Sequence, residues 1–495
     1  MKLKRIFTLF LILGIIGSPL VLSAETQTAT YPDESVHTTD SHHTAPHVDG
    51  ADLSIIWAIP FIGILLSIAV FPLVAPHFWH HHFGKISAFW AAILIIPFIL
   101  FQGLTTTIYE LLHVSLLEYF PFIILLLALF TISGGVRVTG KLQGSPIVNT
   151  GIILLGTVLA SWMGTTGAAM LLIRPLIRAN KWRQKNVHII VFFIFLVANI
   201  GGSLTPLGDP PLFLGFLKGV DFFWTTTNMF FPMLTAVAIL LALFFMIDSY
   251  FYNMEKMPAE SQQESQATGV KIGLEGKFNL LLLLGVIGSV LLSGFWHSGV
   301  SYNIHHVEVE LQNLVRDLLL IGLTITSWKM TPMVVRKANE YSWFPIMEVA
   351  KLFAGIFITI IPAIAILKAG TNGSMSSVIN SVSDGYGNPV NYMYFWATGV
   401  LSSFLDNAPT YLVFFNTAGG DAIQLMGPMS QTLLAISMGA VFMGANTYIG
   451  NAPNFMVKSI SEEAGINMPS FFGYMIKYSL PILIPIFIII SWIYF

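Results

Sequence analysis

Long apolar stretches separated by short polar segments run along the whole chain. A membrane-spanning helix needs about 20 apolar residues, and full-length stretches occur at 53–75, 86–105, 119–135, 230–250, 278–296, 310–328, 344–366 and 471–494. Two longer stretches, 186–218 and 430–460, are broken in the middle by Gly, Pro, Asn and Thr, and we interpret them as discontinuous crossing helices. The pattern therefore predicts an all-α polytopic membrane protein with about ten full crossings.

Two further stretches, 147–180 and 391–418, carry polar tips at 163–167 and 404–410. We interpret them as re-entrant hairpins that enter and leave on the same side. The predicted cytoplasmic loops then carry fifteen Lys and Arg residues, whereas the outer loops hold little beyond Lys218 and Lys368. This is the asymmetry of the positive-inside rule. It predicts a multi-pass protein of a bacterial inner membrane whose mature N-terminus is periplasmic.

The first fifty residues differ from the rest. Residues 1–24 combine a positive start, a short apolar run and small residues, which predicts a signal sequence, with an uncleaved anchor helix as the alternative. Residues 25–52 are polar and are expected to form a disordered periplasmic tail. Its histidines and those at 77 and 80–82 invite a metal interpretation, but no carboxylate or thiolate framework accompanies them. Residues 251–277 are expected to be a cytoplasmic linker.

Composition narrows the class of protein further. The chain is 55% hydrophobic and 10% charged, against roughly 25% charged in a soluble domain. A formal charge of −2 excludes a nucleic-acid binder built on a basic field. The absence of cysteine excludes disulfides and thiol chemistry. Because no catalytic motif is present either, we expect no enzyme and no cofactor beyond a coupling ion.

An internal repeat is the most informative feature. Residues 202–213 match residues 444–455 at an offset of 242, with the shared pattern G-x-x-T-x-x-G-[DN]-x-P-x-F. The same offset aligns the two hairpin tips. Each unit, 53–250 or 278–495, has five crossings and a hairpin, so the second copy should be inverted. Inverted repeats with paired broken helices are typical of secondary transporters, whose site lies between the repeats near the bilayer midplane.

Two carboxylates stand out at the breaks, Asp209 and Asp406, each aligned with a neutral residue of the other repeat. A carboxylate at this depth resists ionisation, so both are predicted proton or cation coupling groups, with Asp406 as the principal group and Asp209 as the second; the alternative is that they cap half-helices. Neutral oxygens for substrate or cation binding are expected from Thr165, Thr166, Thr205, Asn407, Asn446, Thr447 and Asn451. A sodium site is predicted at Asp406, Asn407, Thr447 and Asn451. The helix breaks are assigned to Gly202, Gly208, Pro211, Pro409, Gly444, Gly450 and Pro453.

The segments 198–211, 401–407 and 444–454 resemble the ion transporter superfamily, which includes D-type bacterial sodium/proton antiporters, arsenite-pump and P-protein-like permeases, and citrate-type carriers. The resemblance implies the fold, a secondary-transport mechanism and a homodimer. The Asp-Asn tip and the Gly-Asp break look most like the sodium/proton branch. The tip at 163–167 matches neither this branch nor the dicarboxylate carriers well. The expected function is exchange of sodium, or a similar cation, for protons. Transport of citrate, a dicarboxylate or another oxyanion is the alternative, and a channel or membrane-embedded sensor is a remote one.

Overall fold

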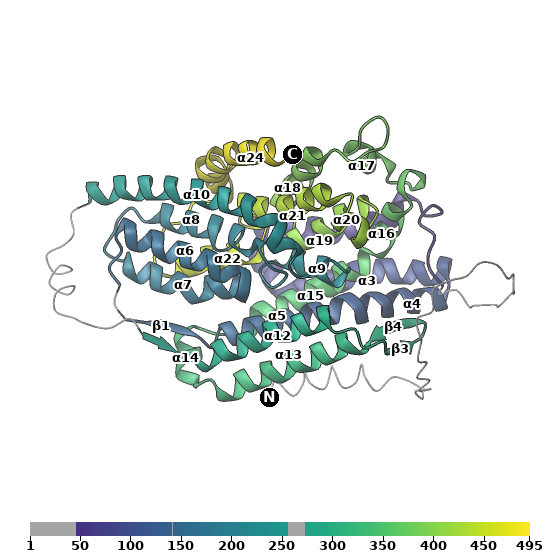
Figure 1. Cartoon of the computed structure of the whole chain (residues 1–495), viewed down its shortest axis with the longest axis horizontal. Coiled ribbons are helices and arrows are strands. Elements are labelled where there is room, and N and C mark those ends of the chain that lie inside the picture. The colour runs from purple at the N-terminus through teal and green to yellow at the C-terminus, as the bar shows by residue number, and fades with distance from the viewer. Residues whose placement is uncertain (1–45, 141, 256–272) are drawn as a thin grey trace.

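Helices dominate the computed structural model, which describes residues 46–140, 142–255 and 273–495 (Figure 1). Within these ranges, seven helical segments are long and apolar enough to cross a membrane, and an eighth is bent by 43° at Ile360. The seven are Ile55–Val74, Pro76–Gln102, Leu104–Ser133, Pro146–Met163, Trp224–Met254, Phe278–Phe295 and Phe471–Tyr494. The prediction of a helical, multi-pass membrane protein is confirmed.

The first half of the chain begins with helices that form one flank of the molecule. Its elements are η1 Ile55–Ala58, α2 Ile59–Val74, α3 Pro76–Gln102, α4 Leu104–Val114, η2 Ser115–Tyr119, α5 Phe120–Ser133, β1 Arg137–Thr139, α6 Pro146–Met163, α7 Thr165–Ala179, α8 Val187–Leu196, η3 Ile200–Ser203, α9 Pro210–Leu217 and α10 Trp224–Met254. The histidines at 77 and 80–82 lie in the first turns of α3 rather than in a loop, because the helix begins at Pro76.

The second half follows a comparable order. Its elements are β2 Gly273–Glu275, α12 Phe278–Phe295, β3 Ser301–Ile304, β4 Val307–Glu310, α13 Leu311–Met330, α14 Met333–Ala338, α15 Phe344–Thr359, α16 Ile361–Lys368, η4 Gly370–Asn372, α17 Ser376–Ser381, α18 Asn391–Phe404, α19 Asn407–Thr417, α20 Ala422–Met426, α21 Ser430–Met443, η5 Gly444–Asn446, α22 Ala452–Glu463, α23 Phe471–Tyr474, η6 Met475–Ser479 and α24 Leu480–Tyr494. Although α13 has the length of a span, it carries Arg316, Asp317 and Lys329 and is not among the apolar seven.

Two small antiparallel sheets depart from an all-α architecture. β1 pairs with β2, which ties the start of the second half to the first, and β3 pairs with β4. In Figure 1, β1 and α14 lie at one end of the molecule, and β3, β4 and α16 lie at the other. The long helices run between these two ends.

The whole predicted signal sequence lies outside the described residues. Residues 25–45 of the predicted tail and residues 256–272 of the predicted linker also lie outside them. The last residues of the predicted disordered tail are packed against the bundle. Gly50 lies so close to α16 that a Cβ there would stand 1.9 Å from the carbonyl oxygen of Ala365. Val48 N donates to Glu110 Oε1 at 3.3 Å.

The stretch 147–180 folds as a helical hairpin. The chain reverses at Gly164, whose φ of +79° suits a residue without a side chain. It returns to the end at which it started, because Gly144 N donates to Ala179 O at 2.8 Å. The stretch 391–418 reverses in the same way, with α18 and α19 in contact on either side of the turn. Both predicted reversals are therefore present.

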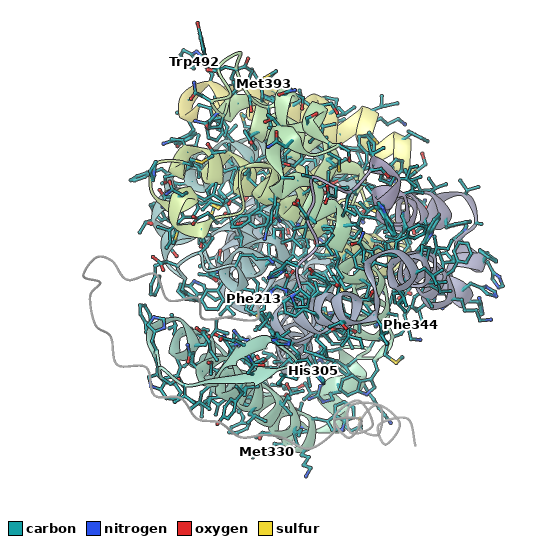
Figure 2. All side chains as sticks on the ribbon, turned by 90° about the vertical axis from the view of Figure 1, so that its right-hand side faces the viewer. Phe213, His305, Met330, Phe344, Met393 and Trp492 are labelled. Carbon is teal, nitrogen blue, oxygen red and sulfur yellow. The ribbon has the colours of Figure 1, made fainter. Side chains whose placement is uncertain are left out.

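The two broken stretches form the centre of the molecule. Every residue from His188 to Leu196 of α8 is buried, as is every residue from Thr432 to Met443 of α21. Figure 2 shows Phe213 of α9 in the middle, with Trp492 and Met330 at opposite edges. Irregular backbone at this depth is tolerated only inside protein or beside a wet cavity, and here it is enclosed by protein.

Because the natural chain has no cysteine, single introduced cysteines report which end of the molecule is accessible from which side. Lys181 follows α7 and Lys329 lies in the last turn of α13, both at the β1 end, whereas Tyr386 is 94% exposed near the other end. A membrane-impermeant thiol reagent should label Lys181→Cys and Lys329→Cys from one side and Tyr386→Cys from the other. Labelling of the first two from opposite sides would contradict the hairpin.

Candidate functional site

Four short helices begin at one place in the interior. We call them the four site helices: α7, α9, α19 and α22, which start at Thr165, Pro210, Asn407 and Ala452. Two follow hairpin tips, and two follow helix breaks. Each break helix has proline in its first turn, where the missing N–H costs nothing. The positive ends of four helix dipoles therefore converge on a single region.

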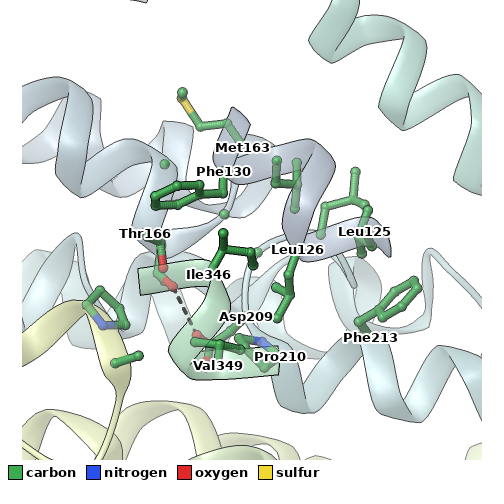
Figure 3. Close-up of a pocket in the computed structure, with 18 of the residues that line it drawn as sticks. Leu125, Leu126, Phe130, Met163, Thr166, Asp209, Pro210, Phe213, Ile346 and Val349 are labelled. Carbon is green, nitrogen blue, oxygen red and sulfur yellow. Dashed lines mark hydrogen bonds between the residues drawn. The ribbon is translucent and has the colours of Figure 1, made fainter. Parts of the chain in front are cut away.

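The carboxylate of Asp209 lies at the centre of this region. Its Oδ1 accepts hydrogen bonds from Thr165 Oγ1 at 3.1 Å and from Asn451 Nδ2 at 2.9 Å. Its Oδ2 accepts from Asn407 Nδ2 at 2.5 Å. All four residues are buried. One carboxylate thus joins both hairpin tips and both breaks, so four of the predicted site residues come together. Figure 3 shows Asp209 among its neighbours.

Asp209 has no cationic partner among the described residues: no Lys, Arg or His forms an ion pair with it. The other buried aspartate, Asp248, differs, because it pairs with Arg183 at 2.5 Å and with His188 at 2.8 Å. An isolated buried carboxylate is costly in its charged form unless dipoles or a bound ion compensate. The chemistry of Asp209 is therefore suited to exchange between a charged state and a state that holds a proton or a cation.

Two threonines hold the breaks to the tips in the same manner. Thr205 Oγ1 donates to the carbonyl oxygen of Ser161, and Thr447 Oγ1 donates to that of Ser403. Both pairs are related by the offset of 242 residues. These hydroxyls are hydrogen-bonded to the backbone. Thr447 Oγ1 also accepts hydrogen bonds from the N–H groups of Ile449 and Gly450. Thr205 and Thr447 therefore hold the breaks against the tips, and their role in substrate or cation binding stays a prediction.

The glycines of the breaks allow backbone segments to meet. A Cβ on Gly208 would lie 2.1 Å from the carbonyl oxygen of Gly202, and one on Gly450 would lie 2.5 Å from that of Gly444. Gly208 O also accepts a hydrogen bond from Thr165 N at 2.8 Å. Pro211 and Pro453 lie in the first turns of α9 and α22, and Pro409 lies in that of α19. The predicted helix-breaking residues occupy the breaks and the tip.

Asp406 takes the place that the capping alternative describes. It is the N-cap of α19, its Oδ1 accepts from Ala408 N at 3.0 Å, and it is only half-buried. It lies close enough to Asp209 to act on it electrostatically, but its side chain does not join the hydrogen-bonded group. Of the predicted sodium set, Asn407 and Asn451 meet at Asp209, whereas Asp406 and Thr447 form no hydrogen bond with either of them among the described residues, and the sodium site stays a prediction.

Thr166 and Asn446 lie beside the group around Asp209. Thr166 is half-buried and lines the neighbouring cavity. Asn446 Nδ2 donates to Ser403 Oγ at 2.9 Å. Within the described residues, the side-chain oxygens of Asn407 and Asn446 are buried without a hydrogen-bond partner. The amide oxygen of Asn199, at the first break, is also buried without a partner, so three neutral oxygens of the type that hard cations prefer are unpaired in this region.

Sequence reasoning missed a pair of asparagines that connects the two breaks. Asn199 Nδ2 donates to Asn454 Oδ1 at 2.7 Å, and Asn454 Nδ2 donates to the carbonyl oxygens of Gly444 and Thr447. It also missed the serines at 161 and 403, whose backbone carbonyl oxygens accept hydrogen bonds from Thr205 and Thr447. The repeat contained a signal for these serines, because they are identical residues at the offset of 242.

A cavity of about 110 Å³ adjoins Asp209 (Figure 3). Its walls come from α5 and α15 on one side and from the tip at 163–167, the break at 206–213 and the start of α22 on the other. Phe130, Ile346 and Val349 give it apolar surfaces, and Thr166 and Asp209 are among its few polar groups. The cavity gives the buried carboxylate a space in which a small ligand or water can lie.

Residues 50–495 match the model of a family described as "Putative citrate transport". The chain belongs to this citrate-transport family. The search among curated proteins returned no similar sequence. The family match supports the carboxylate alternative better than the main expectation of sodium/proton exchange, and it does not bear out the resemblance to D-type antiporters or arsenite pumps. A citrate-transport family implies a small carboxylate substrate and a lipid bilayer around the protein.

The close approach at the breaks predicts which glycines tolerate a methyl group. Gly208→Ala should destabilise the protein by about 1–3 kcal/mol or more, because a Cβ forces two backbone segments apart. Gly288→Ala is the matched control, since this exposed glycine of α12 has nothing within 4 Å of its added Cβ. Thermal unfolding in detergent checks both. Equal midpoints for the two variants would contradict the packing described for the break.

Proposed function

We propose that this protein is a secondary active transporter that carries citrate, or a related small carboxylate, together with a proton or small cation bound at Asp209. The observation that carries the proposal is the convergence of the four site helices on a buried carboxylate that has no cationic partner in the described part of the chain, which belongs to the citrate-transport family. Nothing in this arrangement resembles a catalytic constellation, so transport rather than enzymatic turnover is the activity proposed.

The helix starts provide for the anion. Helix N-termini favour negative groups because unpaired N–H groups and the positive dipole end face the ligand. Within the described residues, the N–H groups of Thr166 and Gly167 in the first turn of α7 have no backbone acceptor, and both residues line the cavity. Thr166 adds a hydroxyl. A carboxylate of the substrate is therefore placed at the start of α7, on the cavity side of Asp209.

Asp209 provides the coupling. An anionic substrate and an ionised Asp209 repel each other in a space of low dielectric. A proton or a cation on Asp209 removes this repulsion, so the ion and the substrate favour each other's binding, and the effect is reciprocal. Sodium is the alternative to the proton, and the unpaired oxygens of Asn407 and Asn446 are its proposed additional ligands. Co-transport follows from this electrostatic linkage.

The alternating access of such a site is ascribed to two inverted repeats, 53–250 and 278–495, with two re-entrant hairpins and about ten crossings. The matching contacts of Thr205 with Ser161 and of Thr447 with Ser403 support the repeats. The basic loops support an inner-membrane orientation in which the β1 end is cytoplasmic and the mature N-terminus periplasmic. A homodimer is proposed only from the family-level resemblance.

Cation/proton exchange without a carboxylate is the second candidate function. It is favoured by one observation: among the described residues, no Lys or Arg pairs with Asp209 to attract an anion. A group that exchanges a proton for a cation needs no other charge near it. The two candidates differ in what crosses the membrane, so a transport measurement separates them.

Proteoliposomes that contain the purified protein should accumulate labelled citrate when an inward proton or sodium gradient is imposed, because the coupling ion brings the anion with it. Empty liposomes are the control for leakage. Uptake of a dicarboxylate in place of citrate would retain the proposed class with another substrate. Dissipation of a pH gradient by sodium alone, with no carboxylate uptake, would instead establish cation/proton exchange and reject the proposal.

Asp209→Asn keeps the size of the side chain and removes its titratable charge. It should lower gradient-driven uptake at least about tenfold, equivalent to roughly 1.4 kcal/mol, while the protein still folds. Asp406→Asn is the matched control and should transport nearly normally, because Asn caps a helix about as well as Asp. Labelled-substrate uptake at equal protein loading checks both variants.

A charge-swap variant sharpens this test. Asp209→Asn combined with Asn451→Asp moves the carboxylate across a hydrogen bond of 2.9 Å within the same group. It should recover part of the uptake that Asp209→Asn loses. Normal coupled transport by Asp209→Asn, or a loss confined to Asp406→Asn, would show that the coupling group has been assigned to the wrong aspartate.

A further inference from the structure

The two lysines that sequence analysis left on the outer face lie near each other in the structure. Lys218 is the C-cap of α9, and Lys368 is the last residue of α16. The Lys368 side chain reaches past the end of α19, since its Cε lies 3.4 Å from the position of a Cβ on Gly420. Lys218 therefore lies at the outer end of α9, and the side chain of Lys368 lies beside the outer end of α19.

A buried glutamate lies between this pair and the surrounding helices. Lys218 Nζ contacts Glu118 Oε1 at 2.5 Å, and Glu118 is 4% exposed. Its second oxygen has no partner among the described residues. Glu118 belongs to η2, a π-helical turn between α4 and α5, and such turns occur frequently at functional sites. Lys368 lies within electrostatic range of Lys218 and Glu118.

Several other charged groups at this end have partners of their own, such as Asp421, which caps α20, whereas the exposed Asp221, three residues after Lys218, has no ion-pair partner among the described residues. Glu110 accepts from Val48 N and lies 3.4 Å from His47, and Arg316 is buried beside Asp317. His113 lies one turn before η2 within range of the same lysines. Among the described residues, Glu118 pairs with Lys218, and Lys368 has no direct ion-pair partner.

We propose that Lys218 and Lys368 form an entry site that captures a di- or tricarboxylate substrate at the outer face. Glu118 forms an ion pair with Lys218 while the site is empty. The inference rests on the proposed function and adds a second binding position to it. Two ammonium groups near each other suit an anion that carries two carboxylates. Since positive charge is scarce on this face, the pair also steers the anion towards the outer ends of α9 and α19.

Lysines at helix C-termini also complement the negative dipole end, and the experiment separates that role from capture. Uptake of labelled citrate into right-side-out proteoliposomes is measured against substrate concentration at low and high ionic strength. Lys368→Met should raise KM by about three- to tenfold, while the maximal rate stays within about twofold, because capture precedes the buried site. The increase of KM with salt should be smaller than in the wild type. Lys329→Met, on the opposite end, is the control and should change neither value.

Glu118→Gln should change KM in the opposite direction to Lys368→Met, and this distinguishes substrate capture from a purely structural ion pair. It frees Lys218 for the substrate, so KM should fall, whereas loss of a structural ion pair would lower the maximal rate or the yield of folded protein. Lys218→Met leaves Glu118 buried and unpaired, so it is combined with Glu118→Gln, and the double variant should lose the gain of the single one.

The outcomes bear on the two proposals differently. An unchanged KM in Lys368→Met together with no decrease in Glu118→Gln would overturn the entry site and leave citrate transport standing. A wild-type protein that takes up no carboxylate would overturn the proposed function and the entry site with it. An equal rise of KM in Lys329→Met would show that net charge, and not this pair, attracts the substrate.

Discussion

The hydrogen-bonded group around Asp209 is the interaction on which the rest of the structure depends. Thr165, Asn407 and Asn451 donate to one carboxylate from three different site helices. A buried acid of this kind is stable only while its donors remain in place, because each unsatisfied polar group in an apolar interior is costly. The group therefore couples the arrangement of both hairpins and both breaks to the state of one side chain. A ligand that changes the charge of that side chain changes the balance of forces on all four helices.

Backbone packing keeps this group in position. The breaks are close-packed, since Gly208 lies against Gly202 and Gly450 against Gly444, with no room for a side chain. Asn199 and Asn454 then connect the first break to the second, and the threonines at 205 and 447 connect each break to its tip. Polar backbone that would be exposed by an interrupted helix is satisfied in this way. The apolar walls of α5 and α15 leave the cavity beside Asp209 as the adjoining space for a small ligand.

Charge is distributed so that the interior and the outer face have different roles. Asp209 has no cationic partner among the described residues, whereas Asp248, buried near the C-terminal end of α10, pairs with Arg183 and His188. In the proposed function, the first acid is therefore available to a coupling ion and the second is not. At the outer ends of α9 and α19, Lys218, Lys368 and Glu118 provide the charges that the centre lacks. In the proposed entry path, an anion would pass from these lysines to the starts of the site helices.

The sequence alone determined the helical membrane class, most of the long helices, both tips and both breaks. Apolar runs and Gly or Pro interruptions are local, and the offset of 242 residues identified the segments that correspond. The sequence also identified both aspartates but ranked Asp406 first, because spacing does not reveal which acid caps a helix and which accepts hydrogen bonds from neighbouring side chains. Only the tertiary structure decided that Asp209 is central, since its contacts to Asn407 and Asn451 join residues 198 and 242 positions apart. The same holds for Asn199 with Asn454 and for Lys218 with Glu118. Such pairs are selected by the packing of distant helices against one another, which no local pattern of residues encodes.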